Sequence, residues 1–513
     1  MKIINLLKKV NKNFTDCYVV GGALRDILLE KNFYDIDIII KNLNTKKLNK
    51  IICEINLPFV ILDKENKIYR TVVKEENFTV DISSYTNLGK DLLRRDFTIN
   101  TLLMSLEDFI SQYERNISNY EKSGKKVFKL KSKFELDKVI DYFGAVRDIK
   151  NKKLRLVSED SLSSDSLRIL RVARFMSLGF VPDKKINTKV RESLRLLKKV
   201  SAERIADELR KIFSVSSYPV VEWMDKNNIL TTIFPQLKIA KEKGKNTKFK
   251  KFYFHEEGLW QHIKLTYKKV EFVLDNLDSI LAKEAKVIRQ YFSDFPEAIF
   301  CVKVASLFHD IAKPLVIKRI DGRVRFFYHE EKSKEITSIA LKKMKLSNWE
   351  INLICNLVEN HMRLGNLCHS KDLTEKGIIR LFNKLGEDIF PLIILSLADR
   401  YSYDSVPERK KDLELNEMPV FKKFLRKLLR RYLEYKKRQS IPRLLNGDVL
   451  IKEFGLKEGP LIGEILDYVR QAQFLKHIST SDEAKKLVKE YLNNLKRSYQ
   501  PQLNGKYRDA DCK

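Results

Sequence analysis

The stretch VVGGALRDILLEKNFYDIDIII, residues 19–40, decides the fold at the N-terminal end of the chain. It places two glycines after an apolar run, then a helical pattern, and then Asp35 and Asp37 at the start of a second apolar run. Alternate residues of a β-strand point to the same face, so these two carboxylates stand side by side. The isoleucines around them indicate burial, which argues against solvated acids on an exposed edge strand. The stretch predicts a small α/β domain with a pair of acids on a buried strand.

The paired acids and the glycine turn together predict a site for a metal ion and a triphosphate. Two like charges on one face repel, and one takes up a proton unless a cation holds both. Mg²⁺ prefers a few carboxylates together with phosphate oxygens. Gly21 and Gly22 precede a helix expected to begin near Ala23, and such a turn lets backbone approach a ligand while the helix N-terminus attracts phosphate. Arg25 adds a charged fork in the first turn.

Composition and charge indicate a polyanionic partner. The 513 residues include 99 Lys and Arg against 68 Asp and Glu, a net charge of +31. This favours nucleic acid, although an anionic membrane surface also attracts such charge and a general richness in Lys, Ile and Asn contributes to it. The six cysteines form no CxxC pair, and neither a signal-like segment nor a run of 18 apolar residues occurs. We expect a soluble cytoplasmic protein with reduced thiols and no membrane partner.

The distribution of strand and helix patterns predicts an α+β fold. DIDIII, PFVILD, RTVV and FTVDIS, all within the first 85 residues, are short β patterns. The polar break SEDSLSS at 158–164 is followed by patterns that are almost entirely helical. We therefore expect a small α/β head with a mixed β-sheet, followed by an elongated all-α neck, body and tail.

Six ordered blocks resemble one family. GGALRD with DID resembles the nucleotidyltransferase head of the class II tRNA nucleotidyltransferases and bacterial poly(A) polymerases. DLLRRDFTIN (91–100) is similar to the family's RRDFTINA signature, and DYFGAVRDI (141–149) to its DPFGGxxDL. SSDSLRILRVARF (163–175), VSAERIADEL (200–209) and IFPQL (233–237) resemble the next family blocks in the same order.

The resemblance implies template-independent addition of nucleotides to an RNA 3′ end. Asp35 and Asp37 would hold two Mg²⁺ ions, and Asp81 in FTVDIS is a predicted third catalytic carboxylate, with a structural acid at a strand end as the alternative. The remaining implied nucleotide contacts lie in the glycine turn and the RRDFTIN block, with Asp96 near the ribose: Gly21, Gly22, Arg25, Arg94, Arg95, Asp96 and Asn100.

Asp165 and Arg168 are predicted to choose the base. They are three residues apart on a predicted helix and therefore neighbours on one face. Cytosine and adenine show an amino donor beside a ring-nitrogen acceptor, which suits an aspartate acceptor and a guanidinium donor, whereas guanine and uracil show the reverse. The resemblance implies that these positions read CTP and ATP, with Arg171 and Arg174 beyond them. An ion pair on a solvated helix face is the alternative.

Three departures from the family pattern leave the product open. The family's glutamate before Asp165 is Ser164 here. Only residues 83–93 separate Asp81 from the RRD block, where many members carry a flexible loop linked to switching from C to A addition. About 30 extra residues, 107–136, follow FTIN. Full CCA addition, CC addition and A addition therefore remain alternatives.

The second half of the chain resembles the HD phosphohydrolase domain that some family members carry. LWQHIKL, SLFHDIAKP, FYHEEKS, VENHMRL and LADR supply imidazoles and carboxylates suited to a divalent transition metal, although a lone histidine is usually a packed core residue. The implied ligands are His262, His309, Asp310, His329, His361 and Asp399. The expected domains are the head at 1–150, a base-recognition neck at 151–240, the HD body at 241–440 and an RNA-binding tail at 441–513. The basic segment 238–256 is predicted to be a linker or an RNA-contacting surface, and the last ten residues to be disordered.

The chain is thus predicted to add C and/or A from CTP or ATP to the 3′ end of tRNA. A poly(A) polymerase acting on general RNA 3′ ends is an alternative with the same head. An HD phosphohydrolase whose head only binds RNA is an alternative of another class. The sequence leaves open how far addition proceeds, whether the HD domain is catalytic and with which metal, the oligomeric state, and the role of residues 107–136.

Overall fold

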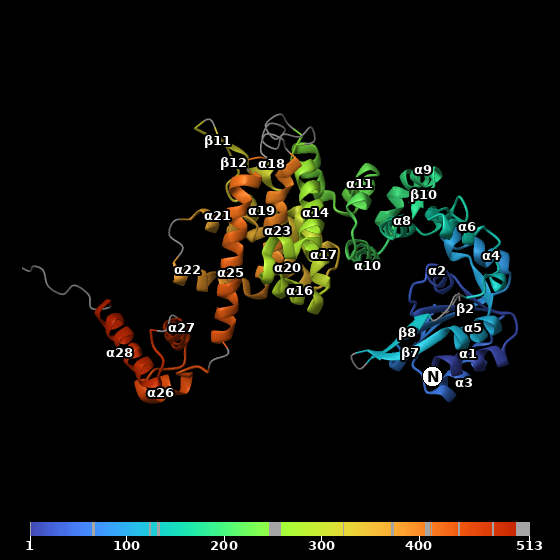
Figure 1. Ribbon diagram of the computed structural model, residues 1–513, viewed down its shortest axis with the longest axis horizontal. Coiled ribbons are helices and arrows are strands. Elements are labelled where there is room, and N and C mark those ends of the chain that lie inside the picture. The colour runs from blue at the N-terminus through green and yellow to red at the C-terminus, as the bar shows by residue number, and fades with distance from the viewer. Residues whose placement is uncertain are drawn as a thin grey trace, which may run out of the picture. The chain divides into compact units, whose positions relative to one another are not determined.

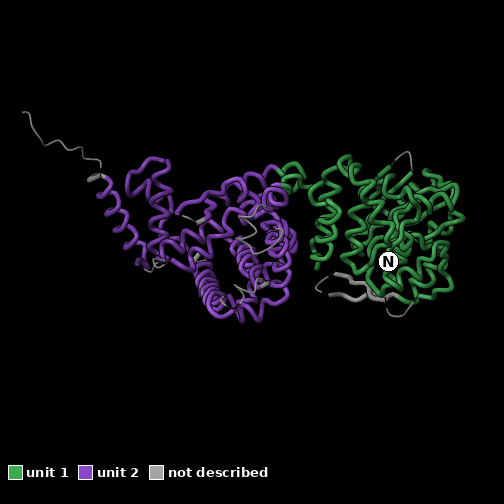
Figure 2. Tube along the Cα trace, turned by 90° about the horizontal axis from the view of Figure 1, so that it is seen from above, with its two compact units in different colours: residues 1–238, 340–346 green, residues 239–339, 347–513 purple. Residues whose placement is uncertain are grey.

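The structure is a computed structural model (Figure 1) that describes residues 2–63, 67–122, 125–130, 134–245, 258–321, 323–370, 374–405, 411, 413–439, 442–474 and 477–498. Two compact units divide the chain (Figure 2): Met1–Lys238 with Ala340–Leu346, and Ile239–Ile339 with Ser347–Lys513. The division after Lys238 lies close to the boundary expected at 240. Most of the basic segment 238–256 and the last ten residues lie outside the described residues.

A mixed sheet forms the centre of the head, as the fold class predicted. Its strand order is β3-β4-β5-β2-β1-β6, in which β2 and β5 are parallel and the other neighbouring pairs antiparallel. The strands are β1 (Cys17–Val20), β2 (Asp35–Lys41), β3 (Phe59–Asp63), β4 (Ile68–Val73), β5 (Phe78–Tyr85) and β6 (Leu103–Ser105). β2 lies inside the sheet, which is why its isoleucines are buried on both faces.

Helices cover the sheet and connect its strands. They are α1 (Lys2–Asn13), α2 (Gly22–Leu28), α3 (Thr45–Ile55), α4 (Leu88–Leu93) and α5 (Leu106–Asn116). α1 packs against both α3 and α5, and α2 packs against β1 and β2. Phe109 and Tyr113 of α5 contact Phe33 and Phe78 of the core, and these contacts are edge-on. The extra residues 107–136 form most of α5 and the antiparallel hairpin β7 (Ile117–Lys122) and β8 (Lys125–Leu130).

A helical neck completes the first unit. Its elements are α6 (Ala145–Lys150), α7 (Ser161–Ser164), α8 (Arg168–Ser177), α9 (Lys184–Ser193), α10 (Ala202–Phe213), α11 (Tyr218–Lys226), α12 (Ile229–Ile233) and the short parallel pair β9 (Lys153–Leu154) and β10 (Val181–Pro182). α8 buries one face, including Ile169, Val172 and Ala173, and packs against α10 and α11. Its opposite face carries the arginines of the SLRILRVARF block.

The second unit is built around a helical core. α17 (Glu297–Phe308) is buried along nearly its whole length and packs against α14 (Leu259–Asp275), α20 (Asn348–Asn360) and α23 (Ile389–Tyr401) (Figure 1). The other elements are α15 (Leu277–Leu281), α16 (Ala285–Asp294), α18 (Lys313–Val316), β11 (Lys318–Ile320), β12 (Arg323–Arg325), α19 (His329–Lys343), α21 (Arg363–His369), α22 (Glu375–Leu385) and α25 (Met418–Gln439).

The C-terminal helices have a small hydrophobic core of their own. They are α26 (Gly447–Phe454), α27 (Pro460–Phe474) and α28 (Ser481–Ser498), and Leu450, Ile465, Val469 and Val488 meet between them. A separate apolar core packs these three helices against one another, and the RNA-binding tail expected at 441–513 stays a prediction. Within the described ranges, no helix has the length and apolar character needed to cross a membrane.

Candidate functional site

The head acids meet at the centre of the mixed sheet. Asp37 of β2 is paired in register with Asp81 of β5 on one side and with Val20 of β1 on the other, and Asp35 is paired with Thr79. Burial raises the pKa of Asp37 to about 6, repulsion from Asp81 and Asp35 adds to the increase, and Arg95 partly offsets it. A buried aspartate with a raised pKa beside two further acids fits a divalent metal site.

Asp81 has a cationic partner that the sequence analysis missed. Arg70 of β4 binds it in a two-pronged ion pair, Nε to Oδ1 at 2.8 Å and Nη2 to Oδ2 at 2.7 Å. Arg70 and Asp81 are paired in register on neighbouring antiparallel strands, which sequence patterns do not reveal without the strand pairing. Asp81 is therefore held by Arg70 at the edge of the acid cluster, and its expected role as a third catalytic carboxylate stays a prediction.

The glycine turn lies directly against the acids. Gly21 has φ of 80°, and a Cβ placed there would lie 3.0 Å from Nη1 of Arg95 and 3.4 Å from Oδ2 of Asp37. Only glycine fits this backbone conformation and this space. Gly22 begins α2, with the Arg25 guanidinium close by. The turn thus leaves room beside Asp37 and Arg95 that any side chain would fill.

A hydrogen-bonded chain joins predicted residues from three separate blocks. Nη1 of Arg25 donates to Oδ1 of Asn100 at 2.7 Å, and Nδ2 of Asn100 donates to Oδ1 of Asp96 at 2.9 Å. Nη2 of Arg171 lies 2.9 Å from the other Asp96 oxygen. Arg25, Asp96 and Asn100 are buried, so the network is rigid and links α2, the RRDFTIN block and α8.

The residues predicted to read the base are arranged differently from the expectation. α8 begins at Arg168, so Asp165 precedes the helix instead of sharing a face with Arg168. Oδ1 of Asp165 accepts the backbone N–H of Leu167 at 3.2 Å, which is the local turn that aspartate favours before a helix. Oδ2 of Asp165 accepts Nη2 of Arg204 at 3.0 Å. Asp165 therefore pairs with α10 instead of lying beside Arg168 on one helix face, and base reading by the two residues stays a prediction.

The arginines of this segment are held individually. Nη1 of Arg168 donates to the carbonyl of Ser161 at 2.9 Å, and its other nitrogen donates to the carbonyl of Arg94, whose own side chain is exposed. Nη1 of Arg174 lies 3.7 Å from Oε1 of Glu208. The structure thus gathers the head acids, Gly21, Arg25, Arg95, Asp96, Asn100 and Arg171. Arg168 contacts the backbone of the RRD block in the same region.

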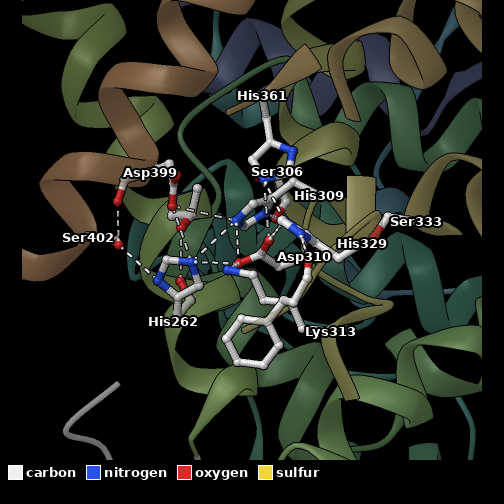
Figure 3. A network of polar contacts seen from close by, with 12 residues as sticks. His262, Ser306, His309, Asp310, Lys313, His329, Ser333, His361, Asp399 and Ser402 are labelled. Carbon is white, nitrogen blue, oxygen red and sulfur yellow. Dashed lines mark hydrogen bonds and ion pairs between the residues drawn. The ribbon is translucent and has the colours of Figure 1, made fainter. Parts of the chain in front are cut away.

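All six residues expected in the HD domain converge (Figure 3) and form two candidate metal-binding sets that meet at Asp310. One set is His262, His309 and Asp399, and the other is Asp310, His329 and His361, with the ligand atoms of each within 4.8 Å of one another. Oδ1 of Asp310 lies 3.2 Å from Nε2 of His329 and 3.3 Å from that of His361. Its Oδ2 lies 3.3 Å from Nε2 of His262 and 3.4 Å from that of His309. The carboxylate is therefore shared by both sets.

Outer partners orient the imidazoles toward this centre. Three Nδ1 atoms face backbone carbonyls, which accept only, so each Nδ1 carries the proton and each Nε2 presents its lone pair inward. The fourth, on His262, lies 3.0 Å from the hydroxyl of Ser402. The carbonyl contacts are His309 to Ser306 at 2.9 Å, His329 to Phe326 at 2.7 Å and His361 to Val358 at 2.8 Å. This donor set suits a divalent transition metal.

Lys313 is a further member of the centre that the sequence analysis missed. Its Nζ lies 2.5 Å from Oδ2 of Asp310, and both side chains are buried. Burial alone would raise the pKa of Asp310, but Lys313 and His309 outweigh it and hold that pKa well below its usual value. The spacing HDIAK was an available signal, because residues three apart meet on a helical turn.

Comparisons with known proteins agree with this geometry. Family models match in order: a poly A polymerase head domain at 17–155, a probable RNA and SrmB-binding site of polymerase A at 179–240, and an HD domain at 260–404. The CC-adding tRNA nucleotidyltransferase of Thermus thermophilus is 26% identical over 92% of both chains. The A-adding tRNA nucleotidyltransferase of Deinococcus radiodurans is 24% identical over 92% of this chain and 95% of its own.

The solved structures agree on the fold. The Bacillus stearothermophilus CCA-adding enzyme in complex with CTP superposes with a TM-score of 0.58 at 17% identity, over 97% of this chain and 98% of its own. Together, the three domains in order and the relatives matched over most of their length confirm the resemblance seen in the sequence blocks. The chain carries a poly A polymerase head domain, the RNA-binding segment that follows it and an HD domain, and it is similar over most of its length to tRNA nucleotidyltransferases.

Proposed function

We propose that the protein is a metal-dependent nucleotidyltransferase that adds C and/or A from CTP or ATP to the 3′ end of tRNA. The observation that carries the proposal is the meeting of Asp37 with Asp81, Asp35, Gly21 and Arg95 at one point of the sheet. The relatives that match over most of the chain are named for CC addition and A addition to tRNA, which supports both the substrate and the nucleotides.

Asp35 and Asp37 would hold the divalent ion, and their oxygen-only donor set favours Mg²⁺. When bound, Mg²⁺ would favour the deprotonated 3′-hydroxyl and offset the charge that develops on the transferred phosphate and pyrophosphate. The unfavourable ionisation of Asp37 supports this assignment, because a cation is what would make it favourable. Asp81, held by Arg70, would add its charge at the edge of the site.

The surrounding residues would bind and orient the nucleotide. Among the described residues, Nε of Arg95 and Nε of Arg171 are buried without a hydrogen-bond partner, so both can donate to phosphate oxygens. The Gly21 turn leaves space for the triphosphate beside them. Asp96, fixed by Asn100, would orient the ribose. Asp165 and Arg168 would present an acceptor and a donor to the Watson–Crick edge of C or A.

The test uses tRNA transcripts that end before CCA, after the first C and after CC, each with a single nucleoside triphosphate. Incorporation on the first two with CTP, or on the third with ATP, would support the proposal and define how far addition proceeds. A long A tail on any RNA would favour a poly(A) polymerase. No incorporation on any transcript, with wild type matching Asp35→Ala, would rule out nucleotidyl transfer.

A second activity, hydrolysis of a 2′,3′-cyclic phosphate or a phosphate monoester, is favoured by the two ligand sets that share Asp310. A cavity of about 660 Å³ has walls formed by residues next to both His329 and His361, and its charged lining residues are Arg363 and Lys384 together with Glu330, Glu331 and Glu359. The probe is 2′,3′-cyclic AMP with added Mn²⁺ or Ni²⁺. Turnover by wild type that Asp310→Ala abolishes would establish the activity, and equal rates for the two proteins would refute it.

A further inference from the structure

We infer that Arg204 is a positioning residue for nucleotide choice, because it holds Asp165 in the orientation in which a base would be read. The inference rests on the proposed nucleotidyl transfer and adds a specificity residue from α10 to it. Its basis is the ion pair between Nη2 of Arg204 and Oδ2 of Asp165, at 3.0 Å.

Two oppositely charged residues of α10 contact the segment proposed to read the base. Arg204 and Glu208 are four residues apart and therefore lie on one face of α10. Arg204 contacts Asp165 before α8, and Oε1 of the buried Glu208 lies 3.7 Å from Nη1 of Arg174 near the end of α8. α10 and α8 pack along their lengths, so these contacts belong to one helix interface. α10 thus meets the base-reading segment at both ends.

The orientation of the Asp165 side chain depends on Arg204, whereas the orientation of Arg168 depends on backbone groups. Its backbone is extended, with φ of −145° and ψ of 100°, and its side chain is 32% exposed. The Leu167 N–H holds one oxygen, and Arg204 holds the other. Arg168, in contrast, donates to backbone carbonyls of Ser161 and the RRD block, which side-chain substitution does not remove. Backbone carbonyls therefore fix Arg168, the proposed donor to the base. A side chain of α10, Arg204, fixes Asp165, the proposed acceptor.

Loss of Arg204 should relax base choice for a specific reason. With Asp165 in place, C and A satisfy an acceptor and a donor together, while U and G place a carbonyl or a ring N–H against the wrong partner. If Asp165 rotates away, the Arg168 guanidinium alone remains, and it donates to any base acceptor. Rejection of U and G then weakens while binding of C and A also falls.

The experiment measures kcat and KM for each of the four nucleotides on the tRNA transcripts, together with their equilibrium binding in an Asp35→Ala background that cannot turn over. The variants are Arg204→Ala, Arg204→Lys and, as the matched control, Arg210→Ala. Arg210 lies on the same helix in an ion pair with Asp207 at 2.8 Å and has no role in the proposed site.

We expect Arg204→Ala to reduce the preference for C or A over U and G about tenfold or more, with KM for the correct nucleotide raised. Arg204→Lys should restore part of the preference, and Arg210→Ala should keep it. An unchanged preference in Arg204→Ala, even with a lower rate, would overturn the inference while nucleotidyl transfer stands. Selective binding that Arg204→Ala relaxes, without transfer by any variant, would support the inference and refute the proposed transfer. Equal binding of all four nucleotides in the Asp35→Ala background with Arg204 intact, together with equal kcat/KM for all four in wild type, would overturn the inference while nucleotidyl transfer stands.

Discussion

The acid cluster of the head and the HD centre of the body use carboxylates in opposite ways. In the head, Asp37 stands beside two further acids, and burial raises its pKa to about 6. In the body, Asp310 is surrounded by imidazoles and Lys313, which hold its pKa well below the usual value. In the head, the neighbours of Asp37 are mostly acids, so a cation would complete the cluster, whereas in the body the Lys313 ammonium already compensates the charge of Asp310.

The two sites also differ in solvent exposure, since the head site is open and the HD centre is buried. Asp35 is exposed at the start of β2, and the Gly21 turn leaves space beside Asp37. His309 and Asp310 are 0% and 1% exposed, and outer hydrogen bonds set the orientation of their neighbours. A site that must take in and release nucleotides has to stay incomplete between turnovers, while a site that retains metal ions can be closed around them.

The largest effect is expected from a substitution of Asp37 in the head. We expect Asp37→Asn to lower nucleotidyl transfer about 1,000-fold or more, because the metal loses a charged ligand. We also expect the metal-free protein to become more stable at pH 7.5. The pKa of about 6 lies above the ordinary 3.8, so ionisation above pH 6 destabilises the fold by up to about 3 kcal/mol, a cost that vanishes as the pH falls toward 4.

Thermal melting without metal measures the expected gain in stability of Asp37→Asn, and single-turnover rates measure its expected loss of transfer. Asp16→Asn is the control, because Asp16 is an exposed head aspartate paired with Lys41 at 3.1 Å. A lower melting temperature for Asp37→Asn in metal-free buffer would contradict the raised pKa and the assignment built on it.

The next largest effect is expected in the body. Asp310→Asn removes the charged ligand shared by both sets, so the affinity for transition metal should fall about 100-fold or more. Metal retained after dialysis, measured by mass spectrometry, gives the result, and transfer by the head should stay within about twofold. Asp278→Asn, an exposed aspartate paired with Arg289, is the control. Unchanged metal content in Asp310→Asn would show that the carboxylate of Asp310 is not a metal ligand.

Substitutions at two glycines distinguish the effect of filling the space beside Asp37 from the effect of backbone strain. Gly21 and Gly179 have φ of 80° and 89°, but a Cβ at Gly21 would contact Arg95 and Asp37, and one at Gly179 would meet nothing within 4 Å. Both Ala variants should lose roughly 1 kcal/mol of stability. Only Gly21→Ala should also lower kcat/KM for transfer, roughly 10- to 100-fold. Equal kinetic losses in the two variants would mean that the space beside Asp37 is not used by substrate.

The smallest expected effect is a pH dependence of transfer. Asp37 must be ionised to hold the metal, so transfer at subsaturating Mg²⁺ should fall below about pH 6 and be reduced about tenfold at pH 5. Higher Mg²⁺ should move the midpoint to lower pH, because metal and proton compete for the carboxylate. Single-turnover rates from pH 5 to 8, with melting temperatures to show that the fold persists, check the effect. A rate that stays constant through pH 6 at low Mg²⁺ would contradict it.

Much of both sites could be predicted because their ligands sit in local patterns. Asp35 and Asp37 are two apart on one strand, and the HD ligands fall in short blocks whose order resembles a family. The contacts that tune these ligands could not be predicted. Arg70 reaches Asp81 through strand register, and Arg204 reaches Asp165 across a helix interface. The expectation that Asp165 and Arg168 share a helix face was wrong, because the Leu167 N–H turns Asp165 out of the helix.

The sequence by itself determined the α+β class, the acid pair on a buried strand, the glycine turn and the histidines of the body. Periodicity and residue chemistry act over a few residues, so they are readable along the chain. Only the tertiary structure decided which charges compensate one another across the chain: Arg70 for Asp81 and Arg204 for Asp165. Electrostatic partners are set by distances of a few ångströms in space, and segments far apart in the chain come that close only when they pack.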